Sequence, residues 1–127
     1  MLKILCVEDD YIASYMLHER IERMGYFIID KVSTGEDALK LCEWQQPDVI
    51  LMDIRLSGEM DGIEAARRIG EKHGIPIIFI TGISDAGIRK RAKELKPHGF
   101  FTKPFEITEL QQSIDMIFRT RKRGQPV

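Results

Sequence analysis

Asparagine is absent from the 127-residue sequence, which therefore contains no N-glycosylation sequon. Cysteine is scarce: Cys6 lies in an apolar run and Cys42 in a helical pattern, so we expect two buried, reduced thiols rather than a disulfide framework. No apolar stretch approaches the length of a membrane span, and the N-terminus lacks the layout of a signal peptide. We therefore expect a cytoplasmic protein that does not enter a membrane.

Charge of one sign is not in excess either. The net charge is −1, which gives no electrostatic reason to expect direct nucleic-acid binding. Hydrophobic residues make up 43% and charged residues 31% of the sequence, an ordinary balance for a globular protein. At this length and composition we expect one domain with a hydrophobic core of its own.

Several patterns of catalytic sites are missing. The sequence has neither the G-x-x-x-x-G-K-[ST] nor the G-x-G-x-x-G pattern by which glycine-rich loops bind phosphates. His18, His73 and His98 show no metal-ligand spacing, and no Ser or Cys lies in the pattern of a nucleophile elbow. Any chemistry must therefore depend on other side chains.

Short apolar runs alternate with amphipathic segments five times along the chain. The runs have the length, the branched residues and the flanking Gly or Pro that favour strands. They lie at 3–7, 26–32, 48–52, 76–80 and 99–102. The segments after them repeat apolar residues at helical spacing, as Leu110, Ile114 and Ile117 do. Five strand–helix units in series predict an α/β fold: a parallel sheet with helices on both faces, which is a doubly wound three-layer sandwich.

The composition of the strands also predicts their order. The first, third and fourth strands are almost entirely apolar, as expected for central strands that are covered on both faces. The second strand contains Asp30 and Lys31, which suits an edge, so we predict the order 2-1-3-4-5. The expected helix N-cap residues are Asp61, Ser84 and either Asp9 or Asp10.

Acidic side chains follow two strands that this order makes neighbours. Glu8, Asp9 and Asp10 come directly after the first strand, and Asp53 comes after the third. The ligand site of an open α/β sheet lies at the carboxyl ends of its strands, so these acids should face one another. Two like charges about 5 Å apart repel by roughly 3 kcal/mol at an effective dielectric constant near 20. Mg²⁺, which prefers oxygen ligands, would relieve this repulsion and keep positions for water and phosphate.

The other two strand ends carry complementary groups. Thr81 follows the fourth strand and Lys103 follows the fifth. A hydroxyl and an ammonium opposite a metal-bound carboxylate suit a phosphoryl group with its negative charge. Lys103 would also offset the acidic excess when no phosphate is present. The strand ends together predict a metal-dependent phosphoryl site.

At these residues the sequence resembles the receiver domains of two-component response regulators. The resemblance is carried by VEDD at 7–10, LMDIRLSGEMDGIEAA at 51–66, FITG at 79–82 and FTKPF at 101–105. These segments run in the family's order and account for residues 1 to about 119. The resemblance implies a flavodoxin-like (βα)5 fold, with a receiver domain over 1–120 and a basic C-terminal tail or linker remnant over 121–127.

The resemblance also implies the chemistry of the site. Asp53 would be the phosphoacceptor, taking a phosphoryl group from a sensor histidine kinase or a phosphotransfer protein. Thr81 and Lys103 would contact the phosphoryl oxygens. Mg²⁺, or Mn²⁺ in its place, would bind directly to two of the carboxylates and act on the third through water. The metal site would consist of Glu8 (through water), Asp9, Asp53 and the backbone carbonyl of Arg55, while Asp10 would take no part in it.

A conformational switch is implied as well. Phe100 matches the aromatic position that is coupled to Thr81, and the Lys103–Pro104 peptide bond matches one that is cis in the family. Phosphorylation would alter the surface of the fourth helix, fifth strand and fifth helix, which would contact a downstream effector or a C-terminal output domain. A phosphorylation-dependent homodimer through this surface is an open alternative without a specific pattern behind it.

The loop after Asp53 departs from the family pattern. Many receivers have Met-Pro-x-Met-Asp-Gly there, whereas residues 56–59 precede Met-Asp-Gly at 60–62, with no proline and one extra residue. This departure bears on the shape of the loop and on kinase docking rather than on the chemistry. Arg55 and Ile83 match positions that tune the lifetime of the phosphoryl group, and Ile83 is a candidate to shield it from water.

Two other functions compete with a signalling switch that is not an enzyme. A small Mg²⁺-dependent phosphatase or phosphotransferase of the haloacid-dehalogenase type also uses an Asp nucleophile with Thr and Lys. That family has a D-x-D motif after the first strand, where this chain has Glu8-Asp9-Asp10, and it usually has a cap for which there is no room. A phosphorylation-independent interaction module typically loses the acids, Thr or Lys, all of which this chain retains. The switch is therefore the favoured function.

Overall fold

Strands and helices alternate five times along residues 2–122, which the computed structural model describes. Each predicted strand forms, and its ends agree with the predicted range to within one residue. The strands are β1 (Lys3–Val7), β2 (Phe27–Val32), β3 (Val49–Met52), β4 (Ile77–Thr81) and β5 (Gly99–Thr102). The helices are α1 (Tyr11–Arg23), α2 (Gly35–Trp44), α3 (Gly62–His73), α4 (Ala86–Glu94) and α5 (Ile107–Lys122).

The five strands form one sheet in the order β2-β1-β3-β4-β5, as predicted. Every neighbouring pair is parallel, with Cys6 paired to Leu51 and Phe79 paired to Phe100. The charged strand β2 lies at one edge of the sheet and β5 at the other. The sequence order reverses between β1 and β3, so the loops that follow these two strands lie side by side at one edge of the molecule.

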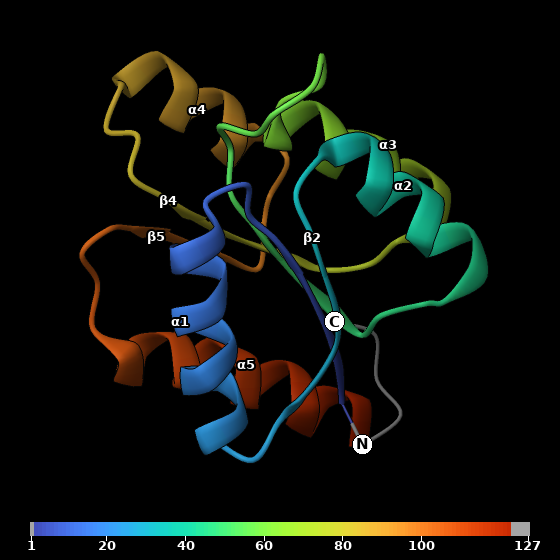
Figure 1. The fold of residues 1–127 in the computed structure, drawn as a ribbon, viewed down its shortest axis with the longest axis vertical. Helices are drawn as coiled ribbons and strands as arrows, with labels where there is room; N and C mark the ends of the chain where they lie inside the picture. Colours follow the sequence, from blue (N-terminus) through green and yellow to red (C-terminus); the bar gives the residue numbers. More distant parts are fainter. Residues whose placement is uncertain (1, 123–127) are drawn as a thin grey trace.

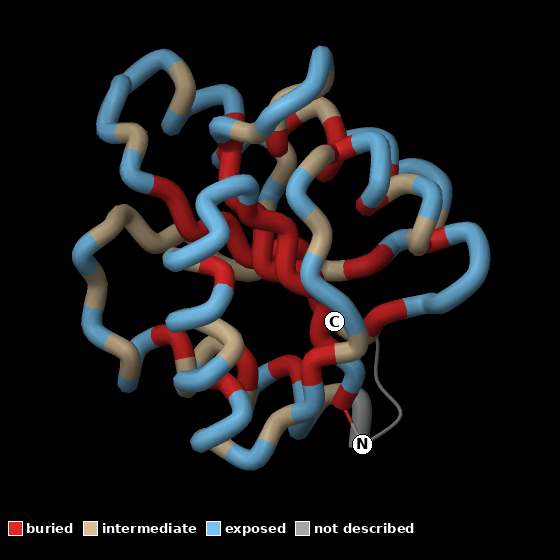
Figure 2. The backbone as a smooth tube through the Cα atoms, in the orientation of Figure 1, coloured by how far each residue is buried: buried red, intermediate tan, exposed pale blue. Residues whose placement is uncertain are grey.

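Alternation of side chains along the strands divides the interior into two cores. Leu5 and Val7 face a core formed with α2, α3 and α4, whereas Ile4 and Cys6 face a core formed with α1 and α5. Figure 1 shows these two helical layers on opposite sides of the sheet, and Figure 2 shows that the buried backbone concentrates in the central strands. The three-layer sandwich predicted from the sequence is confirmed.

Aspartate side chains cap three of the helices. Asp10 accepts a hydrogen bond from the N–H of Ala13 at 3.0 Å, which identifies Asp10 rather than Asp9 as the cap of α1. Asp61 caps α3, as predicted. The prediction of Ser84 as the cap of α4 is wrong, because Asp85 accepts from the helix N–H instead. A carboxylate at this position also interacts favourably with the positive end of the helix dipole, so α4 begins one residue later than expected.

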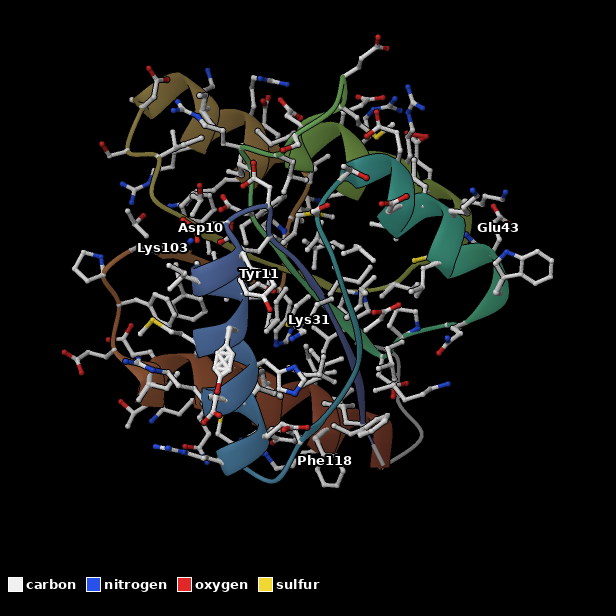
Figure 3. The ribbon with its side chains drawn as sticks, viewed as in Figure 1. Asp10, Tyr11, Lys31, Glu43, Lys103 and Phe118 are labelled. Atoms are coloured by element: carbon white, nitrogen blue, oxygen red, sulfur yellow. The ribbon has the colours of Figure 1, made fainter. Side chains whose placement is uncertain are left out.

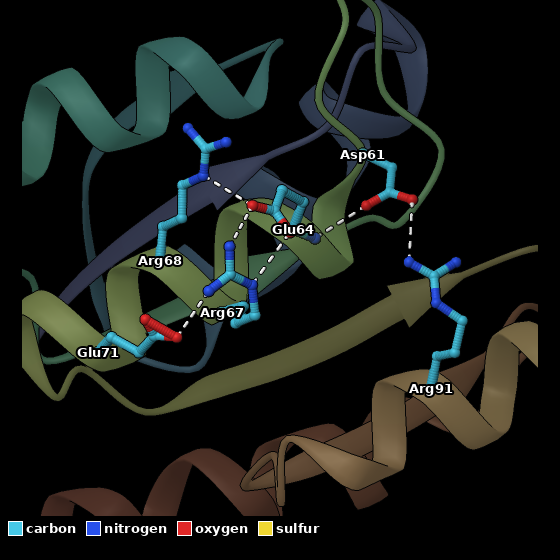
Figure 4. Close-up of polar contacts among 6 residues, drawn as sticks. All are labelled: Asp61, Glu64, Arg67, Arg68, Glu71 and Arg91. Atoms are coloured by element: carbon cyan, nitrogen blue, oxygen red, sulfur yellow. Dashed lines mark hydrogen bonds and ion pairs between the residues drawn. The ribbon is translucent and has the colours of Figure 1, made fainter.

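Ion pairs cover the outer surface of α3. Arg67 bridges Glu64 and Glu71, and Arg68 also pairs with Glu64 (Figure 4). Arg91 of α4 lies 3.9 Å from the carboxylate of Asp61, which links the two helices near the cap of α3. These side chains are exposed, so each pair contributes little to stability and the buried cores dominate.

The structure also describes the two cysteines and the C-terminal helix. Cys6 and Cys42 are buried free thiols, as expected. Among residues 2–122, no helix is long and apolar enough to cross a membrane. Helix α5 continues to Lys122, past the domain boundary expected after residue 120, and the rest of the expected basic tail (123–127) lies outside the described residues.

Candidate functional site

A pocket at the carboxyl ends of the strands brings the predicted site residues together. It is lined by Glu8, Asp9, Asp10, Asp53, Arg55, Thr81, Ile83 and Lys103, together with residues 82 and 84–85. Figure 3 shows Asp10 and Lys103 at this same end of the molecule, although they come from opposite ends of the sequence. The sheet order explains the arrangement, because parallel strands deliver their following residues to one edge.

Backbone hydrogen bonds extend the sheet into the pocket. The N–H of Asp53 donates to the carbonyl of Val7 at 2.9 Å, and the N–H of Lys103 donates to the carbonyl of Thr81 at 2.8 Å. Asp53 and Lys103 are thus fixed by the ladder of the sheet although they follow the last residues of β3 and β5. Thr81 itself is the last residue of β4 rather than the residue after it, as the sequence had suggested.

Lys103 connects two buried carboxylates. Its Nζ donates to Oε1 of Glu8 at 2.7 Å and lies 3.5 Å from Oδ2 of Asp53. Glu8 and Asp53 are each only 8% exposed, so neither charge is well solvated. This ammonium provides the compensation that the sequence had suggested for a pocket without phosphate.

The pKa values of Glu8 and Lys103 are both raised, for different reasons. Burial raises the pKa of Glu8 and the charge of Asp53 adds to it, against the opposing effect of the hydrogen bond from Lys103. Burial lowers the pKa of Lys103, but the hydrogen bond to Glu8 and the charge of Asp53 outweigh it and raise the value overall. Both groups therefore hold a proton more tightly than usual: burial disfavours the charged form of Glu8, and the two carboxylates outweigh the effect of burial on Lys103.

The candidate phosphoacceptor and the threonine are each oriented by a backbone amide. The N–H of Ile54 donates to Oδ1 of Asp53 at 2.7 Å, which leaves Oδ2 facing Lys103. The Thr81 side chain is fully buried, and its Oγ1 accepts from the N–H of Ile83 at 3.3 Å. The hydroxyl hydrogen of Thr81 is therefore available to donate toward the pocket.

The three adjacent acids after β1 have three different environments. Glu8 is buried and paired with Lys103. Asp9 is exposed, and its Oδ2 accepts from the hydroxyl of Ser57 at 3.1 Å. Asp10 caps α1, and its own N–H donates to Oε2 of Glu8 at 3.1 Å. Both carboxylate oxygens of Glu8 thus accept hydrogen bonds and Oδ1 of Asp10 caps the helix, whereas Asp9 accepts through Oδ2 alone among the described residues.

The donor set suits a hard divalent cation that keeps part of its water. Within the described residues, no group of three or more His, Cys, Asp or Glu side chains forms a complete metal cage. The pocket offers two oxygen-donor side chains, Asp9 and Asp53, beside the backbone of Arg55. Mg²⁺ is typically bound by one or two carboxylates with water in its other positions, and its charge would offset the negative charges of these neighbouring carboxylates. The residues present therefore fit Mg²⁺.

Phe100 lies between the core and two cationic side chains of α4. Its ring centre is 6.1 Å from that of Phe79 on β4. On the side of α4, the guanidinium of Arg89 lies 5.5 Å and the Nζ of Lys93 lies 6.0 Å from the ring centre of Phe100. Arg89 also donates to the hydroxyl of Thr102 at 3.1 Å. The Lys103–Pro104 peptide bond, which lies directly after β5, is cis.

Sequence reasoning did not identify three residues that shape this site: Ser57, Gly62 and Arg89. Ser57 contacts Asp9 from a distant loop, and Arg89 contacts Phe100 from another element, so no spacing pattern marks either residue. Gly62 lies against the backbone of Asp53 and had a signal in the sequence, since glycine directly after a capping aspartate often marks a close backbone approach.

A doubly wound α/β domain with an acidic, lysine-containing pocket at its strand ends belongs to a class of fold that hosts several signalling and catalytic functions. The chain itself belongs to the family of response regulator receiver domains, because the sequence model of the family described as "Response regulator receiver domain" matches residues 4–115. This membership confirms the resemblance drawn from the sequence, and it disfavours the phosphatase alternative.

Individual relatives agree with the family. The chain is 31% identical to the transcriptional regulatory protein PdtaR of Mycobacterium tuberculosis over 114 residues, covering 90% of this chain and 55% of the relative. It is 33% identical to the alkaline phosphatase synthesis transcriptional regulatory protein PhoP of Bacillus subtilis over 125 residues, covering 98% and 51%. The chain thus spans about half the length of the curated relatives it matches.

A solved structure shows the same fold. It is the signal receiver domain of a modulated diguanylate cyclase from Desulfovibrio desulfuricans G20, with a TM-score of 0.88 and 35% sequence identity. The match covers 98% of this chain and 100% of that one. The protein is therefore a receiver domain of the two-component response regulators in both sequence and architecture.

Proposed function

We propose that this receiver domain accepts a phosphoryl group on Asp53 from the phosphohistidine of a histidine kinase or phosphotransfer protein. The observation that carries the proposal is the position of Lys103, whose Nζ lies 3.5 Å from Oδ2 of Asp53 while it is held by Glu8 at 2.7 Å. An ammonium held in this position can stabilise the negative charge that develops on the phosphoryl oxygens, because it is already in place before the reaction begins.

The proposed reaction is a displacement at phosphorus. A carboxylate oxygen of Asp53 attacks, a P–O bond forms, and the bond from phosphorus to the donor nitrogen breaks, so that the imidazole leaves and takes up a proton. Thr81 and Lys103 donate to the phosphoryl oxygens. Mg²⁺, held by Asp9, Asp53 and the carbonyl of Arg55, with Glu8 acting through water, would neutralise charge on those oxygens when bound. Catalysis would consist of positioning and electrostatic stabilisation alone, without further enzymatic activity.

The proposed output is a change in the surface formed by α4, β5 and α5. If a phosphoryl group on Asp53 draws Thr81 toward it, Thr81 vacates space that the ring of Phe100 can fill. In the present arrangement this ring packs against Phe79. Phosphorylation need only shift the population of two arrangements of this ring. Since the matched relatives are transcriptional regulators of about twice this length, we propose a downstream effector or a C-terminal output domain as the recipient of the signal. A cytoplasmic location and a phosphorylation-dependent homodimer stay predictions.

Intact mass after incubation with acetyl phosphate and Mg²⁺ tests the proposal. We expect one phosphoryl adduct on the wild-type protein and none on Asp53→Asn or in the presence of EDTA. Asp37→Asn, the same change on the exposed surface of α2, is the matched control and should retain the adduct. Absence of an adduct on the wild-type protein, under conditions in which Mg²⁺ binding is measured directly, would contradict phosphorylation from small donors. A purified histidine kinase that also fails to transfer would overturn the proposal.

A further inference from the structure

The longer loop between β3 and α3 is attached to the start of α2. Ser57 forms an isolated parallel bridge with Thr34, the residue that caps α2. The N–H of Glu59 donates to Oε2 of Glu36 at 3.2 Å. Gly58 between them has a φ of +92°, and a Cβ atom there would lie 2.9 Å from the Glu36 carboxylate. The path of this loop is therefore fixed by α2, although its residues are exposed.

One side chain of this fixed loop, Ser57, bonds a carboxylate of the site. The hydroxyl of Ser57 donates to Oδ2 of Asp9 at 3.1 Å. Over residues 2–122, it is the one side-chain hydrogen bond that Asp9 accepts. Asp9 lies on the turn between β1 and α1, with Glu8 paired to Lys103 on one side and Asp10 capping the helix on the other. Its carboxylate is thus oriented by a residue of the loop between β3 and α3 rather than by its own neighbours in the sequence.

We propose that Ser57 is a positioning residue for the metal ligand Asp9, so that the longer loop takes part in assembling the Mg²⁺ site. The inference rests on the proposed function, in which Asp9 binds the metal directly. A carboxylate has about four lone-pair sites, so Asp9 can accept from Ser57 on Oδ2 and still offer Oδ1 to a cation.

Removal of a hydrogen-bond partner that orients a metal ligand typically costs about 10–100-fold in metal affinity. Ser57 and Asp9 are both exposed and water competes for their hydrogen bond, so we expect the lower end, about tenfold. The effect should appear as a higher Mg²⁺ requirement, while the phosphorylation reached at saturating Mg²⁺ stays that of the wild type.

The test is a Mg²⁺ titration without any phosphodonor, followed through the amide NMR signals of Ile54 and Arg55. We expect Ser57→Ala to bind Mg²⁺ about tenfold more weakly than the wild type and Ser57→Thr, which keeps the hydroxyl, to stay within about threefold. Ser33→Ala, an exposed serine in the loop before α2, is the matched control and should not change the affinity. Thermal unfolding without metal should be alike in all variants.

A pair of nearly isosteric variants keeps the test independent of loop folding. Ser57→Thr and Ser57→Val differ in a hydroxyl against a methyl group, so only the former should support wild-type affinity. Equal Mg²⁺ affinity in these two variants, or a wild-type protein that does not bind Mg²⁺, would overturn the role of Ser57. A protein that binds Mg²⁺ with this dependence on Ser57 but never gains a phosphoryl group would instead refute the proposed function and leave the positioning role intact.

Discussion

A Cβ atom on Gly62 would lie 1.9 Å from the carbonyl oxygen of Asp53. The N–H of Gly62 donates to the carbonyl of Ile54 at 2.7 Å, so the first turn of α3 lies directly against the backbone of the candidate phosphoacceptor. The contact is with main-chain atoms, which cannot rotate away as a side chain would. The first turn of α3 therefore fixes the position of the Asp53 backbone through main-chain contacts.

We expect Gly62→Ala to lower the free energy of unfolding by about 1–3 kcal/mol, because the clash forces α3 away from β3. Gly70→Ala in the same helix is the matched control: a Cβ atom at Gly70 would meet nothing within 4 Å, so this change should stabilise by roughly 0.5–1 kcal/mol. Urea unfolding followed by circular dichroism measures both. A Gly62→Ala protein as stable as wild type would show that the backbone of Asp53 can shift freely.

Lys103→Ala should bind Mg²⁺ more tightly while it loses phosphorylation. The ammonium competes with a cation for Glu8 and Asp53, and a unit charge at about 4 Å contributes about 1 kcal/mol even in water, which is roughly fivefold in affinity. Isothermal titration with Mg²⁺ tests the first effect, and Lys40→Ala, a lysine on α2 away from the pocket, is the control. Weaker Mg²⁺ binding by Lys103→Ala would mean that the lysine holds the carboxylates in place more than it competes.

Ile83→Ala should shorten the lifetime of the phosphorylated form several-fold. Ile83 lines the pocket with Asp53 and is half-buried against the core beneath α4, so its side chain can exclude water from an acyl phosphate. The decay of the intact-mass adduct in excess EDTA gives the lifetime. If the alanine variant decays at the wild-type rate, shielding by Ile83 is wrong.

Arg89→Ala should favour the activated arrangement. The contact of a guanidinium with an aromatic ring is worth about 0.5–1 kcal/mol at an exposed site and more where the ring is desolvated, so its loss at the half-buried Phe100 should shift the population of this ring by at least roughly twofold. The readout is the affinity for beryllofluoride, a phosphoryl mimic, in the presence of Mg²⁺. Arg91→Ala is the control, because Arg91 carries the same charge on α4 but pairs with Asp61 rather than with Phe100. Equal effects of the two variants would mean that the charge of α4, and not the contact with Phe100, causes the change.

Both thiols should be inert in the folded protein. Burial raises the pKa of Cys6 to about 12 and that of Cys42 to about 11, compared with an ordinary value of about 8.5. The thiolate is the reactive form, and it becomes abundant only as the pH approaches these raised values, so reaction with a disulfide reagent at about pH 8 should require unfolding. Denatured protein should react at both thiols at once. Rapid native labelling of one thiol would reveal local opening of β1 or α2.

Much of the site could be predicted because it depends on periodicity and on strand order. Glu8, Asp53 and Lys103 each follow an apolar run directly, and parallel strands place such residues at one edge. One of the one-residue differences has a local cause: Pro76 has no N–H for the ladder, so β4 begins at Ile77. Likewise, Asp85 and Ser84 are both good caps, and sequence alone did not rank them.

The contacts that could not be predicted join segments without a fixed spacing. The bond from Ser57 to Asp9 depends on a loop whose path is set by Glu36 of α2. The contact of Arg89 with Phe100 depends on how α4 lies over β5, which is decided by side-chain packing in the core. Periodicity within one element cannot supply relationships of this kind.

Within the described part of the chain, strand β5 lies at the edge of the sheet and pairs with β4 alone. Its four residues carry Phe100 beneath α4 and lead directly to Lys103 in the pocket, and Thr102 is paired with Thr81. A central strand is held by hydrogen bonds on both sides, whereas this edge strand is held by β4 alone. A displacement of Thr81 can therefore be passed to β5 through the pairing of Thr81 with Thr102. A change of charge in the pocket could thus alter the surface at this edge of the sheet without disturbing the buried cores on which the stability of the fold depends.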